Sequence, residues 1–310
     1  MNLYNFCNLC PRNCGVNRLA GEIGFCGETS ALRIGAALIH KGEEPPLVGT
    51  GGSGTIFISG CNLGCAFCQN YQISQSFVSA PALGRAVSPD EFAKICAALR
   101  DKGAENINIV TGSHAIPALV EGFIAAKKAG VNLPILWNSS GYESINALDL
   151  LKDYVDIYLP DMKTLDSEIA AKYFNAPDYP QVSSAAILKM IDMAHGLKEK
   201  VIIRHLILPG CLDSTYEVLR WFAENVSNRA QLSLMTQYTP IPNRNRPMPD
   251  RYITKEEYET VLGWLRDFSI DDGFCQELVT GSEWLPDFRR FSPFSSELSV
   301  PVWHYNRITF

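Results

Sequence analysis

Short apolar runs alternate with longer segments of helical pattern along most of this chain, and this alternation limits the folds open to it. The strand candidates are residues 55–59, 106–111, 134–138, 155–160, 201–206 and 231–235. The helix candidates are residues 89–102, 116–129, 144–151, 167–173, 183–195, 214–225 and 255–268. Because the strand candidates are almost continuously apolar, they are typical of parallel strands that are covered on both faces. Repeated strand–helix units of this kind predict a parallel sheet with right-handed crossovers.

The number of these units narrows the prediction. A closed barrel of the common (β/α)8 type needs eight units, and this chain offers about six. We therefore expect an α/β fold in which residues 51–270 form an open, partial (β/α)6 barrel. A cysteine-rich segment, residues 1–50, precedes this core. A C-terminal extension, residues 271–310, is rich in Trp, Phe, Ser and Pro and shows no clear periodicity.

Composition excludes several classes of protein. The 310 residues are 46% hydrophobic, which is enough for a full core. No apolar run approaches the ~20 residues that a membrane-spanning helix needs. The first residues lack a basic region followed by an apolar stretch, so we predict no secretory signal and a cytoplasmic location. A net charge of −6 argues against a general nucleic-acid binder, which needs a surface that neutralises phosphates.

Seven of the ten cysteines fall into two tight groups, which in a cytosolic chain indicates metal binding rather than disulfides. One group, Cys61, Cys65 and Cys68, follows the first strand candidate directly, at the end of the strand where α/β folds keep their sites. Three thiolates can hold three corners of a cubane iron–sulfur cluster and leave the fourth iron open for chemistry.

Two alternatives compete with this interpretation of the three cysteines. A structural zinc site usually has four ligands, and no further Cys or His occurs within the next twenty residues. Three merely buried thiols are disfavoured because Gly60, Asn62 and Gly64 make the segment a turn rather than a packed helix face.

The Cys-x3-Cys-x2-Cys pattern, with the aromatic Phe67 just before its last cysteine, resembles the signature of radical S-adenosylmethionine (SAM) enzymes. More narrowly, the chain resembles the PflX-type branch of that superfamily, named for its similarity to the pyruvate formate-lyase activating enzyme. The matching segments are residues 10–15 (CPRNCG), 43–45 (EEP), 52–57 (GSGTIF), 68–70 (CQN), 138–143 (NSSGYE), 156–163 (DIYLPDMK), 204–210 (RHLILPG) and 237–240 (QYTP). The branch is defined by sequence, so the match says little about the substrate.

The resemblance implies the same partial barrel, a [4Fe-4S] cluster on Cys61, Cys65 and Cys68, and SAM bound to the open iron. It also implies that a low-potential electron breaks the S–C5′ bond of SAM, and that the resulting 5′-deoxyadenosyl radical abstracts a hydrogen from the substrate. Phe67 matches the aromatic position that packs near adenine in the family, with an ordinary core phenylalanine as the alternative.

Polar residues after the second and third strands are candidates for holding SAM. Many family members carry Gly-Gly-Glu after the second strand for the amino group of SAM, whereas this chain has Ser113 and His114 there and no carboxylate. The amino group must then meet a hydroxyl, a carbonyl or His114, unless this histidine only caps a helix. Asn138 and Ser140, after the third strand, can hydrogen-bond the ribose or the carboxylate of SAM.

The later strands add further candidates. Asp161 and Lys163 follow the fourth strand two residues apart, so their side chains point the same way if the strand continues. We expect Lys163 to meet the carboxylate of SAM while Asp161 holds it in place; the alternative is an ordinary exposed ion pair. Arg204 and His205 end the fifth strand and Gln237 follows the sixth, so all three should line the same mouth. Arg204 can hold a carboxylate through two parallel hydrogen bonds.

Four more cysteines, Cys7, Cys10, Cys14 and Cys26, predict a second metal site in the N-terminal segment. Four thiolates make a closed site, which favours a structural over a catalytic role. Spacing does not separate zinc from an auxiliary four-cysteine iron–sulfur cluster, so both stay open.

We therefore expect a radical SAM enzyme, an oxidoreductase of the activating-enzyme type or a lyase, in an anaerobic or strongly reducing cell. The expected partners are an electron donor such as flavodoxin or ferredoxin and a protein whose glycine becomes a glycyl radical. One alternative is radical modification of a small molecule or of an RNA base, RNA being disfavoured by the acidic composition. The other is a non-catalytic iron–sulfur protein for electron transfer or scaffolding. The sequence leaves the oligomeric state open.

Overall fold

The computed structural model describes residues 3–74, 82–241 and 248–307. Its strands are β1 (Arg33–His40), β2 (Ser53–Ile58), β3 (Arg85–Ala86), β4 (Ile107–Val110), β5 (Ile135–Ser139), β6 (Ile157–Pro160), β7 (Ile202–Leu206), β8 (Gln231–Met235), β9 (Gly273–Cys275) and β10 (Ser299–His304). Its α-helices are α1 (Pro45–Val48), α2 (Tyr71–Ser74), α3 (Pro89–Asp101), α4 (Ile116–Lys128), α5 (Ile145–Leu148), α6 (Ser167–Ile169), α7 (Tyr179–Met193), α8 (Leu212–Asn225) and α9 (Lys255–Asp267). Short 3₁₀ turns cover Arg18–Ala20, Ser113–Ala115 and Lys198–Lys200, and a π-helical turn covers Ala170–Phe174.

The parallel strands form one curved wall in chain order. One sheet has the order β10-β1-β2-β4-β5-β6, with β3 beside β1, and a second sheet has the order β7-β8-β9. Two isolated parallel bridges, Tyr158 to Val201 and Asp161 to Arg204, join the end of the first sheet to the start of the second. The parallel run is therefore β2, β4, β5, β6, β7, β8 and β9. All six predicted strands are confirmed, and so is the partial barrel.

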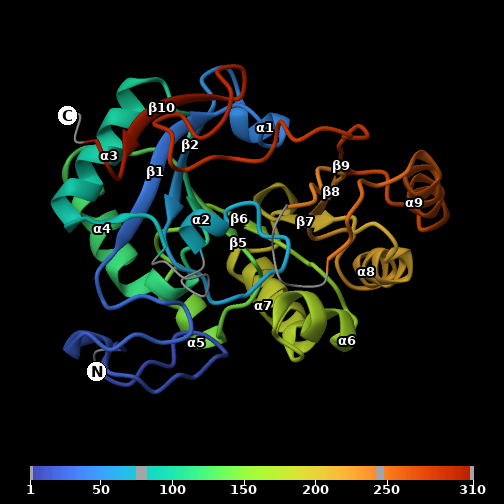
Figure 1. Ribbon diagram of the computed structural model, residues 1–310, viewed down its shortest axis with the longest axis horizontal. Coiled ribbons are helices and arrows are strands. Elements are labelled where there is room, and N and C mark those ends of the chain that lie inside the picture. Colours follow the sequence, from blue (N-terminus) through green and yellow to red (C-terminus); the bar gives the residue numbers. More distant parts are fainter. Residues whose placement is uncertain (1–2, 75–81, 242–247, 308–310) are drawn as a thin grey trace.

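Helices lie around the outside of this wall (Figure 1). The start of α3 shows why one of them begins where it does: the Ser88 hydroxyl accepts a hydrogen bond from the Glu91 amide at 3.2 Å, and Pro89 occupies the first turn. The helix is followed by Gly103 at φ +86°, a conformation that only glycine adopts without strain. None of the described helices combines the length and the apolar character needed to cross a bilayer.

The structure adds four strands that the periodicity did not predict, one of which is the two-residue strand β3 beside β1. The N-terminal segment supplies β1, which pairs antiparallel with both β2 and β10. The C-terminal extension supplies β9 and β10, which close the two ends of the wall. Pro301 inside β10 hides that strand from a sequence pattern, because proline interrupts a ladder. It is tolerated here because β10 is an edge strand that, within the described part of the chain, pairs with β1 alone.

Three helix predictions also shift. The predicted helix 144–151 is only the single turn α5. The predicted helix 167–173 is only α6 followed by the π-helical turn Ala170–Phe174, which ends at Asn175 in the left-handed region (φ +56°). The predicted helix 183–195 begins earlier, at Tyr179, because Pro180 fits the first turn of a helix.

A small apolar plug closes the barrel at the amino ends of its strands. Leu47 of α1 packs there against Leu136, Leu159 and Ile202, which project inward from three neighbouring strands, and all four side chains are at most 3% exposed. A cavity lies above this plug, at the carboxyl ends of the strands, where the cysteine loop lies.

Candidate functional site

The loop after β2 brings Cys61, Cys65 and Cys68 to one cavity of about 700 Å³ at the carboxyl ends of the strands. The chain turns into this loop at Gly60, whose φ is +83°. The amide of Leu63 donates to Cys61 Sγ at 3.3 Å. This contact fixes the position of the Cys61 sulfur in the loop.

The same loop is fastened to the π-helical turn. The Gly64 amide donates to the Phe174 carbonyl at 3.2 Å, and the Ala66 amide donates to the Tyr173 carbonyl at 2.7 Å. Phe67 lies next to them and is 7% exposed. Its ring contacts three other aromatic rings, those of Tyr173, Phe174 and Tyr238, at centroid distances of 5.4 to 6.4 Å. One edge of the cavity is thus a rigid aromatic wall.

The three thiols of the loop suit an iron–sulfur cluster. Soft thiolates favour this chemistry over hard cations such as Mg²⁺. Among the described residues, no group of three or more His, Cys, Asp or Glu side chains is gathered tightly enough for a single metal ion. Three cysteines leave a structural zinc site one ligand short, whereas they suffice for three irons of a cubane cluster. Burial raises the pKa of the Cys61 thiol, and metal binding there must displace its proton.

Ser113 and His114, predicted to reach the amino group of SAM, do not line the cavity. His114 is 3% exposed, its Nε2 lies 2.8 Å from the Ser59 carbonyl, and burial lowers its pKa to about 3, so the ring is neutral. The Ser113 hydroxyl donates to Glu143 at 2.5 Å. Thr111 faces the cavity from this loop instead, and holds an unusual positive φ of +63° for a β-branched residue.

Asn138 and Ser140 both line the cavity, as predicted for residues after the third parallel strand. The Ser140 hydroxyl is buried and has no hydrogen-bond partner among residues 3–74, 82–241 and 248–307. Because a buried hydroxyl without a partner is unfavourable, this group is ready for a ligand.

Asp161 and Lys163 form an ion pair of 2.5 Å at the cavity wall. Their side chains are 22% and 19% exposed, so this is not the exposed pair of the alternative interpretation. Burial acts to lower the pKa of Lys163, but the Asp161 carboxylate outweighs it and the pKa is raised. Lys163 is therefore a fixed positive charge beside the cysteine loop.

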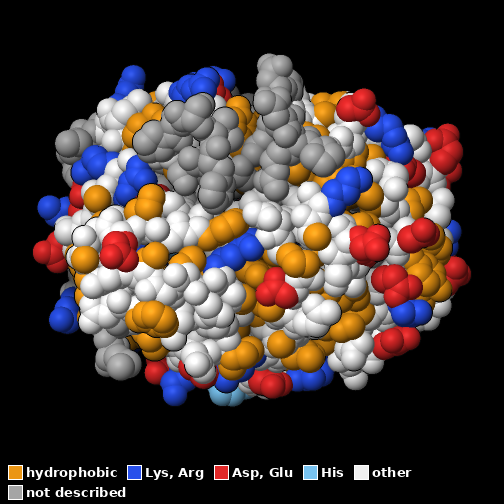
Figure 2. Space-filling view, turned by 60° about the horizontal axis from the view of Figure 1, so that its bottom comes forward, with side chains coloured by type: hydrophobic (Ala, Val, Ile, Leu, Met, Phe, Trp, Pro, Cys, Tyr) orange, Lys and Arg blue, Asp and Glu red, His pale blue; other side chains and the backbone are white. Residues whose placement is uncertain are grey.

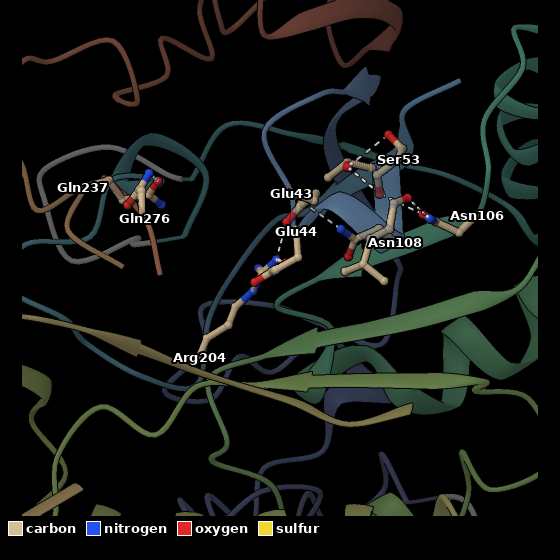
Figure 3. A network of polar contacts seen from close by, with 10 residues as sticks. Glu43, Glu44, Ser53, Asn106, Asn108, Arg204, Gln237 and Gln276 are labelled. Carbon is tan, nitrogen blue, oxygen red and sulfur yellow. Dashed lines mark hydrogen bonds and ion pairs between the residues drawn. The ribbon is translucent and has the colours of Figure 1, made fainter. Parts of the chain in front are cut away.

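Arg204 lines the cavity too, but its guanidinium is already paired within the protein. It donates from Nε to Glu44 Oε1 at 2.8 Å and from Nη2 to both Glu43 and Glu44. Burial acts to lower the pKa of Arg204, and the two carboxylates more than offset it. Figure 3 shows this cluster, in which Asn108 also donates to Glu43 at 2.9 Å.

Sequence reasoning missed Glu43 and Glu44 as site residues. They lie between β1 and α1, in the segment expected to be a separate cysteine-rich addition, and reach Arg204 across 161 and 160 positions of the chain. The matching Glu-Glu-Pro segment was the available signal, and it carried no spatial information.

His205 and Gln237, predicted to line the same mouth, have different positions. His205 points to the opposite side of β7 from Arg204, because side chains alternate along a strand. It is 1% exposed, with Nδ1 at 2.7 Å from the Met162 carbonyl and Nε2 at 3.0 Å from the Thr215 hydroxyl. Gln237 does line the cavity, and its Oε1 accepts a hydrogen bond from Gln276 of the C-terminal extension at 3.1 Å.

The N-terminal cysteines lie in one region as free thiols, three of them buried. Cys14 Sγ accepts a hydrogen bond from the Phe25 amide at 3.3 Å, and burial raises the pKa of Cys10 to about 12. Gly24 passes so close to Cys14 that a Cβ there would lie 2.9 Å from its sulfur. Neither Cys7 nor Cys26 forms, together with Cys10 and Cys14, a group that fits one metal ion.

Two arginines of this N-terminal segment fasten it to the barrel, Arg12 at the cysteine loop and Arg18 at the loop after β4. Arg12 Nε donates to the Asn62 carbonyl at 2.9 Å, directly beside Cys61. The fully buried Arg18 donates to the His114 carbonyl at 2.6 Å and lies 3.9 Å from Cys7 Sγ. The first and second cysteine groups are therefore mechanically connected.

The family model of the radical SAM superfamily matches residues 55–222, which is more than half of the 310 residues. The chain is 33% identical over 274 residues to the uncharacterized protein MJ0674 of Methanocaldococcus jannaschii, covering 87% of this chain and 77% of that protein. It is 26% identical over 215 residues to the pyruvate formate-lyase-activating enzyme of Listeria monocytogenes, covering 64% of this chain and 79% of that enzyme.

Among solved structures, the FeFe-hydrogenase maturase HydG from Carboxydothermus hydrogenoformans has a TM-score of 0.52 and 15% identity. The match covers 69% of this chain and 50% of that chain. At this identity the likeness supports the fold alone.

Proposed function

This chain belongs to the radical SAM superfamily, and on that basis we propose that it cleaves SAM reductively and takes a hydrogen atom from a substrate. Members of this superfamily use a [4Fe-4S] cluster and SAM. When bound, this pair supplies an organic radical through one-electron cleavage of the sulfonium. The protein contributes binding, orientation and the exclusion of water.

One observation carries this proposal: three cysteine thiols, a fixed positive charge and an unpartnered hydroxyl line the same cavity. In the proposal, Cys61, Cys65 and Cys68 hold the cluster. Lys163, oriented by Asp161, attracts the carboxylate of SAM.

Three further residues have proposed roles in the same pocket. The Ser140 hydroxyl and the Asn138 amide hydrogen-bond the cofactor's polar groups, and their positions on the wall support this. Phe67 packs against the adenine with a ring that its aromatic neighbours hold in place. Ser113, His114 and His205 have no proposed contact with SAM, because their side chains lie outside the cavity.

For Cys7, Cys10, Cys14 and Cys26 we propose a structural metal site, zinc or an auxiliary cluster, that closes when metal binds. Free thiols with no disulfide support this, as does the close approach of Gly24 to a sulfur. Because Arg12 reaches the loop that carries Cys61, metal binding at this N-terminal site would also hold that loop in place.

The substrate class is the finer part of the proposal. Similarity to an enzyme named for activating pyruvate formate-lyase supports a protein glycine as the hydrogen donor, with a flavodoxin or ferredoxin as electron source. A small molecule is the second candidate, because the C-terminal extension places Trp284 and Phe294 on the cavity wall and narrows it. An RNA base is disfavoured by the acidic side chains that gather over the α8 and α9 side of the face in Figure 2.

The test uses anaerobically reconstituted protein with dithionite and SAM, and measures 5′-deoxyadenosine by mass spectrometry. We expect product from the wild type and from Cys96→Ala, whose thiol is buried in α3 away from the cavity. We expect none from Cys61→Ala. A wild-type protein with an intact cluster that forms no product would refute the proposed chemistry.

A second experiment addresses the substrate. Incubation with a glycyl-radical-type partner should give a persistent carbon-centred doublet in electron paramagnetic resonance if a protein glycine is attacked. The absence of that doublet, together with hydrogen transfer from an added small molecule, would favour the second candidate.

A further inference from the structure

We call the part of the cavity around His40, Glu43, Glu44 and Arg204 its floor, and this floor carries more negative than positive charge. Among the described residues that line the cavity, the acidic ones are Glu43, Glu44 and Asp161, and the basic ones are Lys163 and Arg204. Asp161 and Lys163 neutralise each other at the wall. The floor is left with two carboxylates facing a single guanidinium, and the two carboxylate side chains are only 8% and 6% exposed.

A second, independent feature of the floor is His40, at the end of β1. It is 7% exposed and lines the cavity. Its Nδ1 lies 3.1 Å from the Leu298 carbonyl, and since a carbonyl only accepts, the proton must be on Nδ1. In the neutral ring Nε2 is therefore a hydrogen-bond acceptor. It has no hydrogen bond with any residue in the described part of the chain and faces the space beside Gly42, where a Cβ would lie 3.3 Å away.

Aromatic rings border this acceptor-rich floor. Trp284 of the C-terminal extension packs against Gly42 so closely that a Cβ there would lie 2.5 Å from the indole. Phe294 packs on the His40 ring with centroids 4.9 Å apart. Carboxylates beside aromatic faces are the combination that attracts an organic cation.

From these observations we propose that the floor around His40, Glu43 and Trp284 binds a protonated amine of the substrate. The proposal rests on the proposed function and deepens it, because it names the chemical class of the group held opposite the cysteine loop. The Glu43 carboxylate supplies the charge, His40 Nε2 accepts a hydrogen bond, and Trp284 covers the cation.

An anionic substrate group fits this floor poorly. The hydrogen bonds of Arg204 to the described residues already use Nε and Nη2, and both go to the glutamates. A carboxylate or phosphate at the floor would meet only the remaining Nη1 and would lie beside both glutamate carboxylates. A cation at the floor would instead meet the net negative charge of two carboxylates and one guanidinium.

The test measures binding to the anaerobic, reconstituted protein by saturation-transfer NMR. The free probes are n-butylammonium, n-butanol and n-butyrate, which share a chain and differ in the head group. A peptide arm, acetyl-Gly-Lys-Gly-amide against its norleucine analogue, separates a side chain of a protein substrate from a free amine.

Two variants locate the site. Glu43→Gln removes one charge but keeps the shape, and the Asn108 oxygen, which has no described partner, can accept from the new amide if the Asn108 side chain flips. Trp284→Leu removes the aromatic cover. The matched control is Glu105→Gln, a carboxylate that accepts hydrogen bonds from the Thr50 and Gly51 amides and is not among the residues that line the cavity.

We expect butylammonium, or the lysine peptide, to bind the wild type and the Glu105→Gln control with equal affinity. Its affinity for Glu43→Gln and for Trp284→Leu should be at least tenfold lower. Equal binding of butanol, tighter binding of butyrate, or an ammonium signal unaffected by both variants would overturn the proposal. Formation of 5′-deoxyadenosine is scored separately. If it appears while no amine binds, only this inference fails; if amines bind and it never appears, only the proposed function fails.

Discussion

Replacing Arg204 with methionine tests the buried charge cluster most severely. The substitution keeps a chain of similar length and leaves Glu43 and Glu44 without their cation. Breaking a buried ion pair from one side typically costs about 3–5 kcal/mol, because the remaining charge stays uncompensated. Two opposite unit charges ~4 Å apart attract each other by about 4 kcal/mol at an effective dielectric constant of ~20, which agrees with this range. We therefore expect the free energy of unfolding of Arg204→Met to fall by about 3–5 kcal/mol at pH 8.

The loss should shrink as the pH falls. Arg204 lowers the pKa of Glu44 despite burial, so the pair contributes stability above the ordinary pKa of 4.5 and loses it as the pH drops through the lower folded value. Without Arg204, burial is left to raise the pKa of Glu44, which then takes up a proton at mildly acidic pH. At pH 5 the difference between variant and wild type should be less than half of its value at pH 8.

Urea unfolding under nitrogen at both pH values measures this difference. The matched control is Arg251→Met, whose exposed pairing with Glu257 should be worth less than about 1 kcal/mol. Adding Glu43→Gln and Glu44→Gln to the Arg204 variant should restore at least half of the loss. A cost no larger than that of the control, or one that does not change with pH, would refute the reasoning.

Three further predictions concern single side chains. Burial raises the pKa of Glu143 from 4.5 to about 7, so the folded state holds a proton that the unfolded state releases. In urea unfolding, the free energy of unfolding of Glu143→Gln should therefore rise relative to wild type by up to about 3 kcal/mol between pH 4.5 and 8. A difference that does not change with pH would contradict this. Lys163→Met should weaken SAM binding in equilibrium dialysis at least tenfold, while Lys189→Met, which loses a surface pair with Asp149, should not change it. Phe67→Ala should cost about 3 kcal/mol by the same urea assay, and a loss below about 1 kcal/mol would mean that its aromatic contacts do not stabilise the loop.

The strands of the barrel were predictable because each is almost continuously apolar and ends at a turn. The segment 231–235 matches β8 in full, and the other five differ by at most two residues at either end. Periodicity reports burial on both faces, which is a local property. It does not report the partners of an edge strand, so β10 with its Pro301 was missed.

The candidate site was predictable where a residue follows a parallel strand and faces inward, as for Asn138, Asp161 and Lys163. His205 shows the limit, because neighbouring residues on one strand point to opposite sides and only the structure shows which one faces the cavity. The two glutamates on Arg204 were beyond sequence reasoning, since contacts across some 160 positions leave no local pattern.

The interaction of SAM with the cluster on Cys61, Cys65 and Cys68 is the most direct test of the central claim. The measurement is the electron paramagnetic resonance spectrum of the dithionite-reduced protein, in which all four N-terminal cysteines are replaced by alanine, before and after SAM is added. A [4Fe-4S] signal that changes when SAM is added is the predicted result. A spectrum without a cubane signal, or with one that SAM leaves unchanged, would contradict the account.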